Sequence, residues 1–182
     1  MKIPRLENQI ARLEPLTMSN FKYLLPIAGE KEILKYSPSD ISTFSKLRAY
    51  VTEALEEANQ DKALPFIILD KRSGKVAGST RFGHIDLKQR KLHIGWTWLG
   101  QEFRGTGLNK AVKELMINYA FGEMRMEKIE FRVDERNLRS RRALEKLGVK
   151  LEGILRKDIY LSDGYKRNTC CYGLLKEEWT IS

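Results

Sequence analysis

The chain has 182 residues, the size of one domain that can bury a full hydrophobic core. Its 33 basic and 24 acidic residues give a net charge of +9, which implies attraction to polyanions without naming one. No apolar run approaches the length of a membrane span, and the N-terminal sequence MKIPRLENQ lacks the apolar stretch of a secretory signal. We therefore expect a single cytoplasmic domain, residues 1–182, with no membrane contact.

The first sixty residues are predicted to form a short strand followed by helices. The strand covers 8–13, and a helical pattern over 17–25 ends near Pro26, because proline interrupts a helix. A clearer helix covers 45–59. Its apolar face consists of Leu47, Val51, Ala54 and Ala58.

Three strands are predicted next, at 66–70, 76–86 and 91–99, joined by turn residues into an antiparallel meander. In the last of them, Trp96 and Trp98 fall on one face by alternation. Two interpretations of these tryptophans compete evenly. Large aromatic residues usually fill a core, but this face could equally line a cleft for a peptide or an amine.

A glycine-rich turn, residues 104–109, follows the third strand and opens a helix. Gly105 and Gly107 lack a Cβ, so the backbone can bend there and a ligand can approach its amides. The apolar residues that follow recur with helical spacing, and Lys113 falls on the opposite, polar face. The predicted apolar face is Leu108, Val112, Leu115 and Tyr119. Because the first amides of a helix lack intrahelical partners at the positive end of its dipole, the turn is predicted to bind phosphate or pyrophosphate.

The turn lacks the Lys-Ser or Lys-Thr pair of a P-loop and the spacing of the three-glycine dinucleotide motif. It resembles the pyrophosphate loop of the GNAT superfamily of acyl-CoA-dependent N-acetyltransferases, with Arg104, Gly107 and Asn109 at the motif positions. Asn109 departs from the small residue usual at the last position. Asparagine can, however, adopt a left-handed backbone or cap a helix.

A second block begins with a predicted strand at 128–133 and continues into a helix. Asn137 is placed at its N-cap and Gly148 just past its end, with Leu144 and Leu147 facing inward. This block is similar to the second cofactor-contacting segment of the same superfamily. The resemblance implies that Asn137 hydrogen-bonds the pantetheine arm and that Ser140 lies near the thioester sulfur.

Three further stretches, RVDERNLRSRRALEKLG, LEGILR and LLKEEW, resemble the RimJ/RimL-like branch, whose named members acetylate N-terminal amines of ribosomal proteins. The resemblance implies acetyl-CoA as cofactor. The implied cofactor-binding residues are Trp98, Leu99, Arg104, Gly105, Thr106, Gly107, Leu108, Asn109, Asn137 and Arg142. The dense basic stretch at 136–142 could hold the phosphorylated ribose. Since basic residues are otherwise spread through the chain, a nucleic-acid-binding module is only weakly supported.

Strands at 149–161 and 165–175 around the turn 162–164 predict a final antiparallel hairpin. Cys170 and Cys171 are adjacent in it, so their side chains point to opposite faces and form neither an ordinary disulfide nor a zinc site. We expect no metal. The predicted fold class is mixed α/β (α+β): a GNAT-like central, mostly antiparallel twisted sheet with helices on both faces.

Acetyl transfer needs a group that removes a proton from the acceptor amine, whose pKa is about 8 for an α-amine and about 10.4 for lysine. His93, with an ordinary pKa of about 6.5, and Asp158 are the candidates. A structural histidine and a solvated surface carboxylate are the competing interpretations. Ser140 is the candidate donor to the departing thiolate, unless it only satisfies a helix-start amide. Neither cysteine has an adjacent base, so direct attack is expected.

We therefore expect an acetyl-CoA-dependent N-acetyltransferase of a primary amine, with the N-terminal amine of a ribosomal protein as a candidate acceptor. Two alternatives stay open. One is acetylation of a small-molecule amine, such as a polyamine, an amino acid or an aminoglycoside. The other is a non-catalytic regulator that binds acyl-CoA or RNA. A homodimer is also compatible with the sequence.

Overall fold

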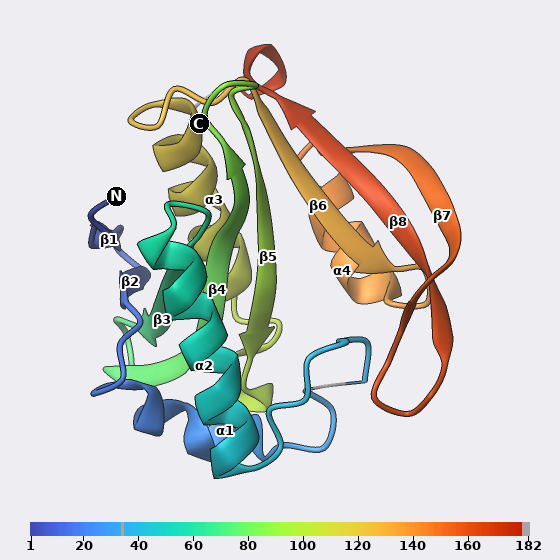
Figure 1. The fold of residues 1–182 in the computed structure, drawn as a ribbon. Coiled ribbons are helices and arrows are strands. Elements are labelled where there is room, and N and C mark those ends of the chain that lie inside the picture. The colour runs from blue at the N-terminus through green and yellow to red at the C-terminus, as the bar shows by residue number, and fades with distance from the viewer. Residues whose placement is uncertain (34, 180–182) are drawn as a thin grey trace.

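The computed structural model describes residues 1–33 and 35–179, and within them one eight-stranded sheet runs through the molecule (Figure 1). The strands are β1 (Leu6–Glu7), β2 (Ala11–Pro15), β3 (Leu64–Asp70), β4 (Lys75–Asp86), β5 (Lys91–Leu99), β6 (Lys128–Asp134), β7 (Lys150–Tyr160) and β8 (Lys166–Leu175). Their spatial order is β1-β2-β3-β4-β5-β6-β8-β7, and neighbours are antiparallel except for β5 and β6. The predicted mixed fold with a mostly antiparallel sheet is confirmed.

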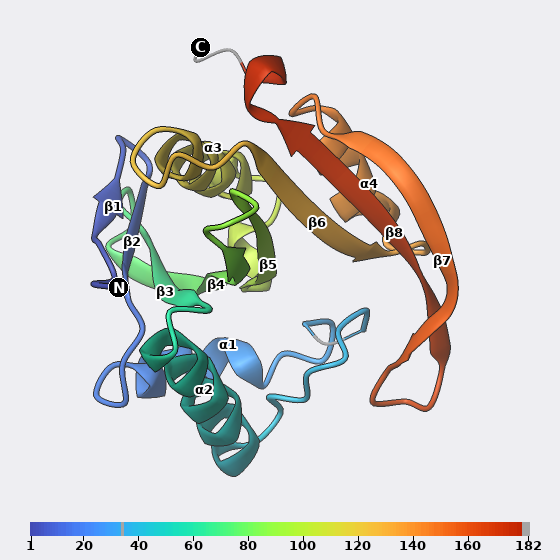
Figure 2. The same cartoon turned by 45° about the horizontal axis from the view of Figure 1, so that its top comes forward.

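Helices cover both faces of the sheet (Figure 2). On one face lie α1 (Leu25–Ala28) and α2 (Phe44–Asn59), and on the other α3 (Leu108–Phe121) and α4 (Leu138–Glu145). Side chains of β3 alternate between the two layers: Phe66 and Ile68 pack in the larger core with α3, whereas Ile67 packs in a second cluster with α2. A strand that is covered on both faces is expected to be apolar along its length, and β3, LPFIILD, is apolar up to its last residue, Asp70. Short 3₁₀ turns occur at Phe21–Leu24, Gln101–Phe103 and Lys176–Glu178.

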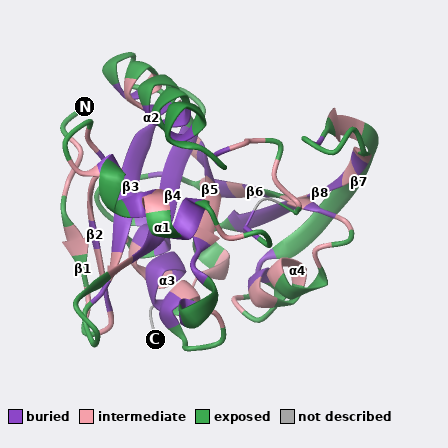
Figure 3. Ribbon diagram, turned by 90° about the horizontal axis from the view of Figure 1, so that it is seen from below, coloured by how far each residue is buried: buried purple, intermediate pink, exposed green. Residues whose placement is uncertain are grey.

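Burial is concentrated in the central strands and in α3, whereas the edge strand β7 is exposed over most of its length (Figure 3). The boundaries of β7 and β8 agree with the predicted final hairpin to within one residue. Cys170 is buried and Cys171 half-buried, and both are free thiols. None of the helices within the described ranges is both long and apolar enough to span a bilayer.

The N-terminal segment differs from the prediction in two places. The strand predicted at 8–13 lies at Ala11–Pro15, because the side-chain oxygen of Asn8 accepts from the amides of Ile10 and Ala11 at 2.9 and 2.8 Å and forms a turn. The helix predicted at 17–25 is instead a 3₁₀ turn followed by α1. Pro26 lies in the first turn of α1, where no N–H donor is needed and the fixed φ of proline suits a helix.

The second predicted helix is confirmed as α2, which begins one residue earlier than predicted. Thr43 caps it by accepting a hydrogen bond from the Lys46 amide. All four residues of the predicted apolar face are buried. These are Leu47, Val51, Ala54 and Ala58.

The parallel strands β5 and β6 pair over three register positions, from Lys91–Lys128 to His93–Glu130. Beyond His93 they diverge, and β5 continues to Leu99 while β6 remains paired with β8 (Figure 1). The sheet therefore opens into a V between β5 and β6. The glycine turn that follows β5 and the start of α4 that follows β6 both come after the open ends of these strands.

Candidate active site

The glycine turn has the geometry that an anion site requires. Gly105 and Gly107 have φ values of 78° and 86°, in the left-handed region that L-residues with side chains rarely adopt. A Cβ added to either glycine would meet no atom within 4 Å, so the described residues leave this side of the turn open. Gly107 is the N-cap of α3 and offers no side chain to the first-turn amides. The Leu108 amide donates to Thr106 Oγ1 at 3.4 Å, whereas the amides of Asn109 and Lys110 have no side-chain acceptor among the described residues and can bind a ligand.

Two arginines hold this turn in place. Arg104 Nε donates to the Leu99 carbonyl at 3.1 Å, and burial, followed by the neighbouring charge of Arg139, lowers the pKa of Arg104. Arg72, at the β3–β4 turn, donates from Nη1 to the Thr106 carbonyl at 3.1 Å. Sequence reasoning missed Arg72, because no motif connects it to a turn 34 positions away.

The start of α4 agrees with the predicted cap. The Asn137 side-chain oxygen accepts from the Ser140 amide at 3.2 Å, and Ser140 itself is half-buried in the first turn. Leu144 is buried, Leu147 is half-buried, and Gly148 adopts φ 81° just past the helix. The predicted cap, inward face and end of this helix are therefore confirmed.

The basic residues around α4 divide into two kinds. Arg136 pairs with the buried Asp134 at 2.8 Å, and Arg141 donates to the Tyr172 hydroxyl at 3.1 Å. Arg136 is thus engaged in the turn that precedes α4, and Arg141 connects α4 to β8. Arg142, by contrast, is exposed in the last turn of α4 and is available to a ligand.

A β-bulge interrupts β5 at the edge of the V. The β4–β5 register shifts between Ser79 and Arg81, and Trp96 in the bulge has a φ of 49°. Such a left-handed, bulky residue is strained, and strain of this kind is typical of functional sites. Trp96 and Trp98 are both half-buried and pack against the second cluster with α1 and α2, as predicted for a shared face.

On this face of β5, His93 lies in a stack of rings that includes His84 and Trp96 at centroid distances of 5.7 and 5.4 Å. Arg81 is buried 4.6 Å from the Trp96 ring and pairs with Glu57 at 2.9 Å. Burial, and then the nearby charges of His84 and Arg132, lower the pKa of His93 to about 3. The expectation of an ordinary pKa for His93 is therefore wrong: the ring is neutral at physiological pH and is a weak base.

Asp158 lies on β7 and is half-buried, so the interpretation as a fully solvated carboxylate does not hold. Its Oδ2 is enclosed, and none of the described residues donates a hydrogen bond to it. The buried Arg167 on β8 lies close enough for the Asp158 charge to act on it, and Arg167 also donates to the Tyr36 carbonyl at 3.1 Å. Asp158 is thus a carboxylate on the far arm of the V.

Lys113 was predicted to lie on the polar face of its helix, and this prediction is wrong, because only 6% of its surface is exposed. The buried face of α3 is rotated toward the sheet centre and includes residues that the four-position pattern left out. It consists of Leu108, Ala111, Val112, Lys113, Met116, Ile117, Ala120 and Phe121. The Lys113 Nζ donates to Thr97 Oγ1 at 2.8 Å and lies 5.8 Å from the Phe131 ring centre.

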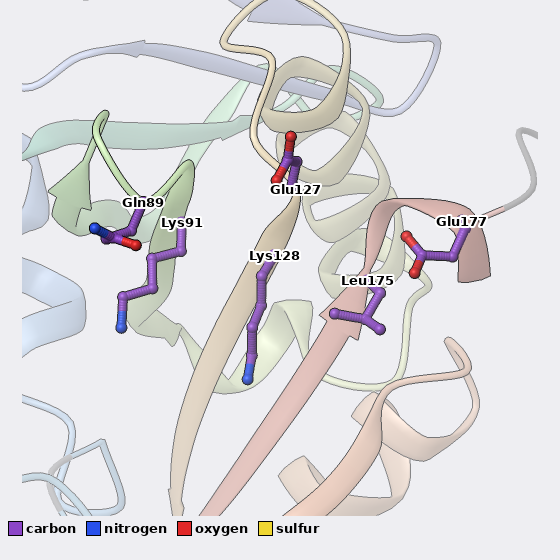
Figure 4. A pocket seen from close by; sticks show the side chains of 6 residues that line it. All are labelled: Gln89, Lys91, Glu127, Lys128, Leu175 and Glu177. Carbon is purple, nitrogen blue, oxygen red and sulfur yellow. The ribbon is translucent and has the colours of Figure 1, made fainter.

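A hollow of about 460 Å³ lies at the opposite end of β5 and β6 (Figure 4). Lys91 and Lys128, at the first residues of the two strands, line it, and each pairs with a glutamate, Glu130 and Glu152 respectively. None of the predicted site residues lines this hollow. It is therefore separate from the V.

The predicted residues thus fall into two groups around the V. The glycine turn, the end of β5 and the start of α4 form the group on the α3 side, together with Lys113. The other group, His93 and Trp96, lies on the α2 side of β5. Asp158 lies on the β7–β8 arm near Arg167, whose charge also acts on His93.

The chain matches the family model described as "Acetyltransferase (GNAT) domain" over residues 11–150. It is 32% identical over 106 residues to the Bacillus subtilis (strain 168) protein named "Putative ribosomal N-acetyltransferase YdaF", a stretch that spans 58% of this chain and 57% of YdaF. A solved structure from T. thermophilus, described as a "putative acetyltransferase", has a TM-score of 0.86 and 35% identity, covering 98% of this chain and 93% of that one. Mycobacterium smegmatis RimJ, solved with CoA-disulfide, has the same fold at a TM-score of 0.84 and 22% identity over 98% of this chain and 89% of its own.

Proposed function

Since the chain belongs to the GNAT family of acetyltransferases and is an acyltransferase that uses acetyl-CoA, we propose that it acetylates a primary amine by direct attack, with the N-terminal amine of a ribosomal protein as the leading acceptor. We also propose that residues 1–182 form one domain, because one sheet includes strands from Leu6 to Leu175. The last three residues of that range lie outside the described part of the chain.

The observation that carries this proposal is the open glycine turn at the mouth of the V. A pyrophosphate needs several backbone donors and close approach, and the first amides of α3 beside Gly105 and Gly107 offer both. The residues present therefore fit acetyl-CoA. In the proposal, Arg104, Thr106, Leu108 and Asn109 complete the turn that holds the pyrophosphate.

Two further elements would hold the rest of the cofactor. The backbone at Trp98 and Leu99 lines the edge of β5 that faces the V, where a pantetheine arm can lie against it. Asn137, the N-cap of α4, would contact the pantetheine arm, and Arg142, in the last turn of α4, would contact the phosphorylated ribose. When bound, acetyl-CoA supplies the activated acetyl group, and Ser140 in the same turn would donate a hydrogen bond near its sulfur.

The acceptor amine must lose a proton before it attacks, and Asp158 is the better supported proton acceptor. A neutral His93 with a pKa of about 3 takes up protons poorly near neutral pH. The enclosed Asp158 oxygen has an unused hydrogen-bonding position on the arm that faces His93 across the V. In this assignment His93 and Trp96 shape the acceptor side of the site and do not carry protons.

The acyl group is proposed to pass directly to the amine without a covalent enzyme intermediate. Burial raises the pKa of both Cys170 and Cys171, so neither is an activated thiolate. Similarity to YdaF supports a protein acceptor. A small-molecule amine is the second candidate acceptor, because the family match carries the reaction and not the acceptor.

The test is incubation with acetyl-CoA and four acceptor classes: N-terminal peptides of ribosomal proteins, the same peptides with a blocked N-terminus, polyamines and aminoglycosides. Free-thiol release reports turnover, and mass spectrometry locates the acetyl group. We expect acetylation of the free α-amine and none of the blocked peptides. Turnover with small amines alone would replace the acceptor assignment, and CoA binding without any thiol release would favour a non-catalytic binding protein.

A further inference from the structure

Lys113 is a buried lysine that the proposed mechanism leaves without a role. Its side chain is 6% exposed, and burial alone lowers its pKa to about 7. Among the described residues, no carboxylate lies within ion-pair distance of the Lys113 Nζ. This atom donates a hydrogen bond to the Thr97 hydroxyl and lies over the ring of Phe131. A buried cation without a counter-ion is costly, and the lowered pKa of Lys113 reflects that cost; a negative charge placed beside Nζ would stabilise its ammonium form.

The position of Lys113 links the two arms of the V. Thr97 lies on β5 and Phe131 on β6, both beyond His93–Glu130, the last register pair of these strands. The lysine thus lies behind the gap that opens where the strands part. Its hydrogen bond is to Thr97, which lies between Trp96 and Trp98 at the β-bulge of β5.

Lys113 lies on the cofactor side of the sheet. It belongs to α3, the helix that begins at Gly107, and it is six residues further along, a rise of about 9 Å. The start of α4, with Ser140, follows the β6 arm on the same face. The acceptor-side residues His93 and Trp96 lie on the other face of β5.

We propose that Lys113 is a catalytic residue whose ammonium group faces the sulfur of acetyl-CoA and protonates it as the thioester is cleaved. As the acetyl carbon–sulfur bond breaks, the sulfur keeps the electron pair and takes a proton from Lys113 Nζ. The new carbon–nitrogen bond releases a proton from the acceptor amine, and Lys113 recovers one from solvent. This inference rests on the proposed use of acetyl-CoA at the V and not on the identity of the acceptor.

The acidities of the two groups are closely matched. A thiol ordinarily ionises near pKa 8.5 and burial lowers the pKa of Lys113 to about 7, so a proton can pass from Nζ to the sulfur at little cost. Arg132 on β6, Arg167 on β8 and Lys113 itself are charged groups that act on His93, and His93 is neutral. Burial alone acts on the pKa of Lys113.

The test measures the thiol pKa of CoA bound to the enzyme, without any acceptor, from the ultraviolet absorbance of the thiolate. A neighbouring positive charge lowers a pKa by about 1–3 units, so the bound thiol should ionise at least tenfold more readily in the native enzyme than in Lys113→Met. Lys88→Met, which removes an exposed lysine on the β4–β5 turn, should match the native enzyme. Thermal melts accompany each variant, and Lys113→Met should melt no lower than native because methionine removes a buried charge.

An unchanged thiol pKa in a Lys113→Met enzyme that binds CoA would overturn the proposal. Complete loss of CoA binding by a folded Lys113→Met would also overturn it, because it would show that the ammonium holds the phosphates. Because the measurement uses CoA alone, failure of the acceptor assignment leaves its result intact. Failure of native CoA binding would instead contradict the proposed cofactor site itself.

Discussion

Replacing Gly107 with alanine tests the cofactor site most directly. With φ at 86°, a Cβ at this position strains the backbone by about 1–2 kcal/mol, although the described residues leave it free space. For a chain of this size such strain lowers the melting temperature by about 2–8 °C. The added methyl group occupies the space where the phosphate would approach the α3 amides. Loss of one hydrogen bond to a charged group weakens binding by about 1.5–3 kcal/mol, or roughly 10- to 100-fold in Kd.

Gly164→Ala is the matched control. Gly164 has φ 81° in the β7–β8 turn, and a Cβ there would also meet no atom within 4 Å. It should therefore lower the melting temperature by a similar amount while CoA affinity, measured by calorimetry, stays at the native value. Equal CoA affinity in folded Gly107→Ala and Gly164→Ala would refute the placement of the phosphate at the glycine turn.

Three further changes follow from the site. Ser140→Ala should lower kcat by roughly 100-fold at saturating acetyl-CoA with little change in acetyl-CoA affinity; full activity with a lower melting temperature would leave Ser140 a structural role. Arg72→Ala removes the brace on the Thr106 carbonyl and should weaken CoA binding several-fold in calorimetry, with binding at the native level excluding a role for the brace. His93 has a pKa of about 3 in the folded state and 6.5 as its ordinary value, so the stability of its neutral form is full above about pH 6.5 and is lost as pH falls toward 3. The free energy of unfolding, measured in urea, should therefore fall less between about pH 7 and pH 5 for His93→Gln than for the native protein. Parallel plots of that free energy against pH for the two proteins would contradict the lowered pKa of His93.

Local patterns were sufficient to predict most elements of this fold. Alternation placed the strands, and the Asn137 cap with Gly148 placed α4, because each signal acts within a few residues of the chain. Pro26 misled the prediction because proline both ends helices and begins them. The choice between these two roles depends on packing against the sheet, which is not visible in a local pattern.

The site was less predictable, because its properties arise between distant segments. Helical periodicity assigned Lys113 to solvent, but the V between β5 and β6 provides a buried position that the pattern cannot represent. The pKa of His93 depends on burial under rings from β4 and β5. Arg72 reaches the glycine turn only in three dimensions.

The short pairing of β5 with β6 also has a consequence for cooperativity. Strand-to-strand hydrogen bonds join β1 through β5 in one half of the sheet and β6, β8 and β7 in the other, whereas only three register positions connect the two halves. Across this seam, side-chain packing in the larger core supplies most of the connection. Local opening should therefore begin at the seam, with fast amide exchange along the unpaired edges near Thr97 and Phe131. A ligand that bridges both arms would fasten the halves together and slow that exchange.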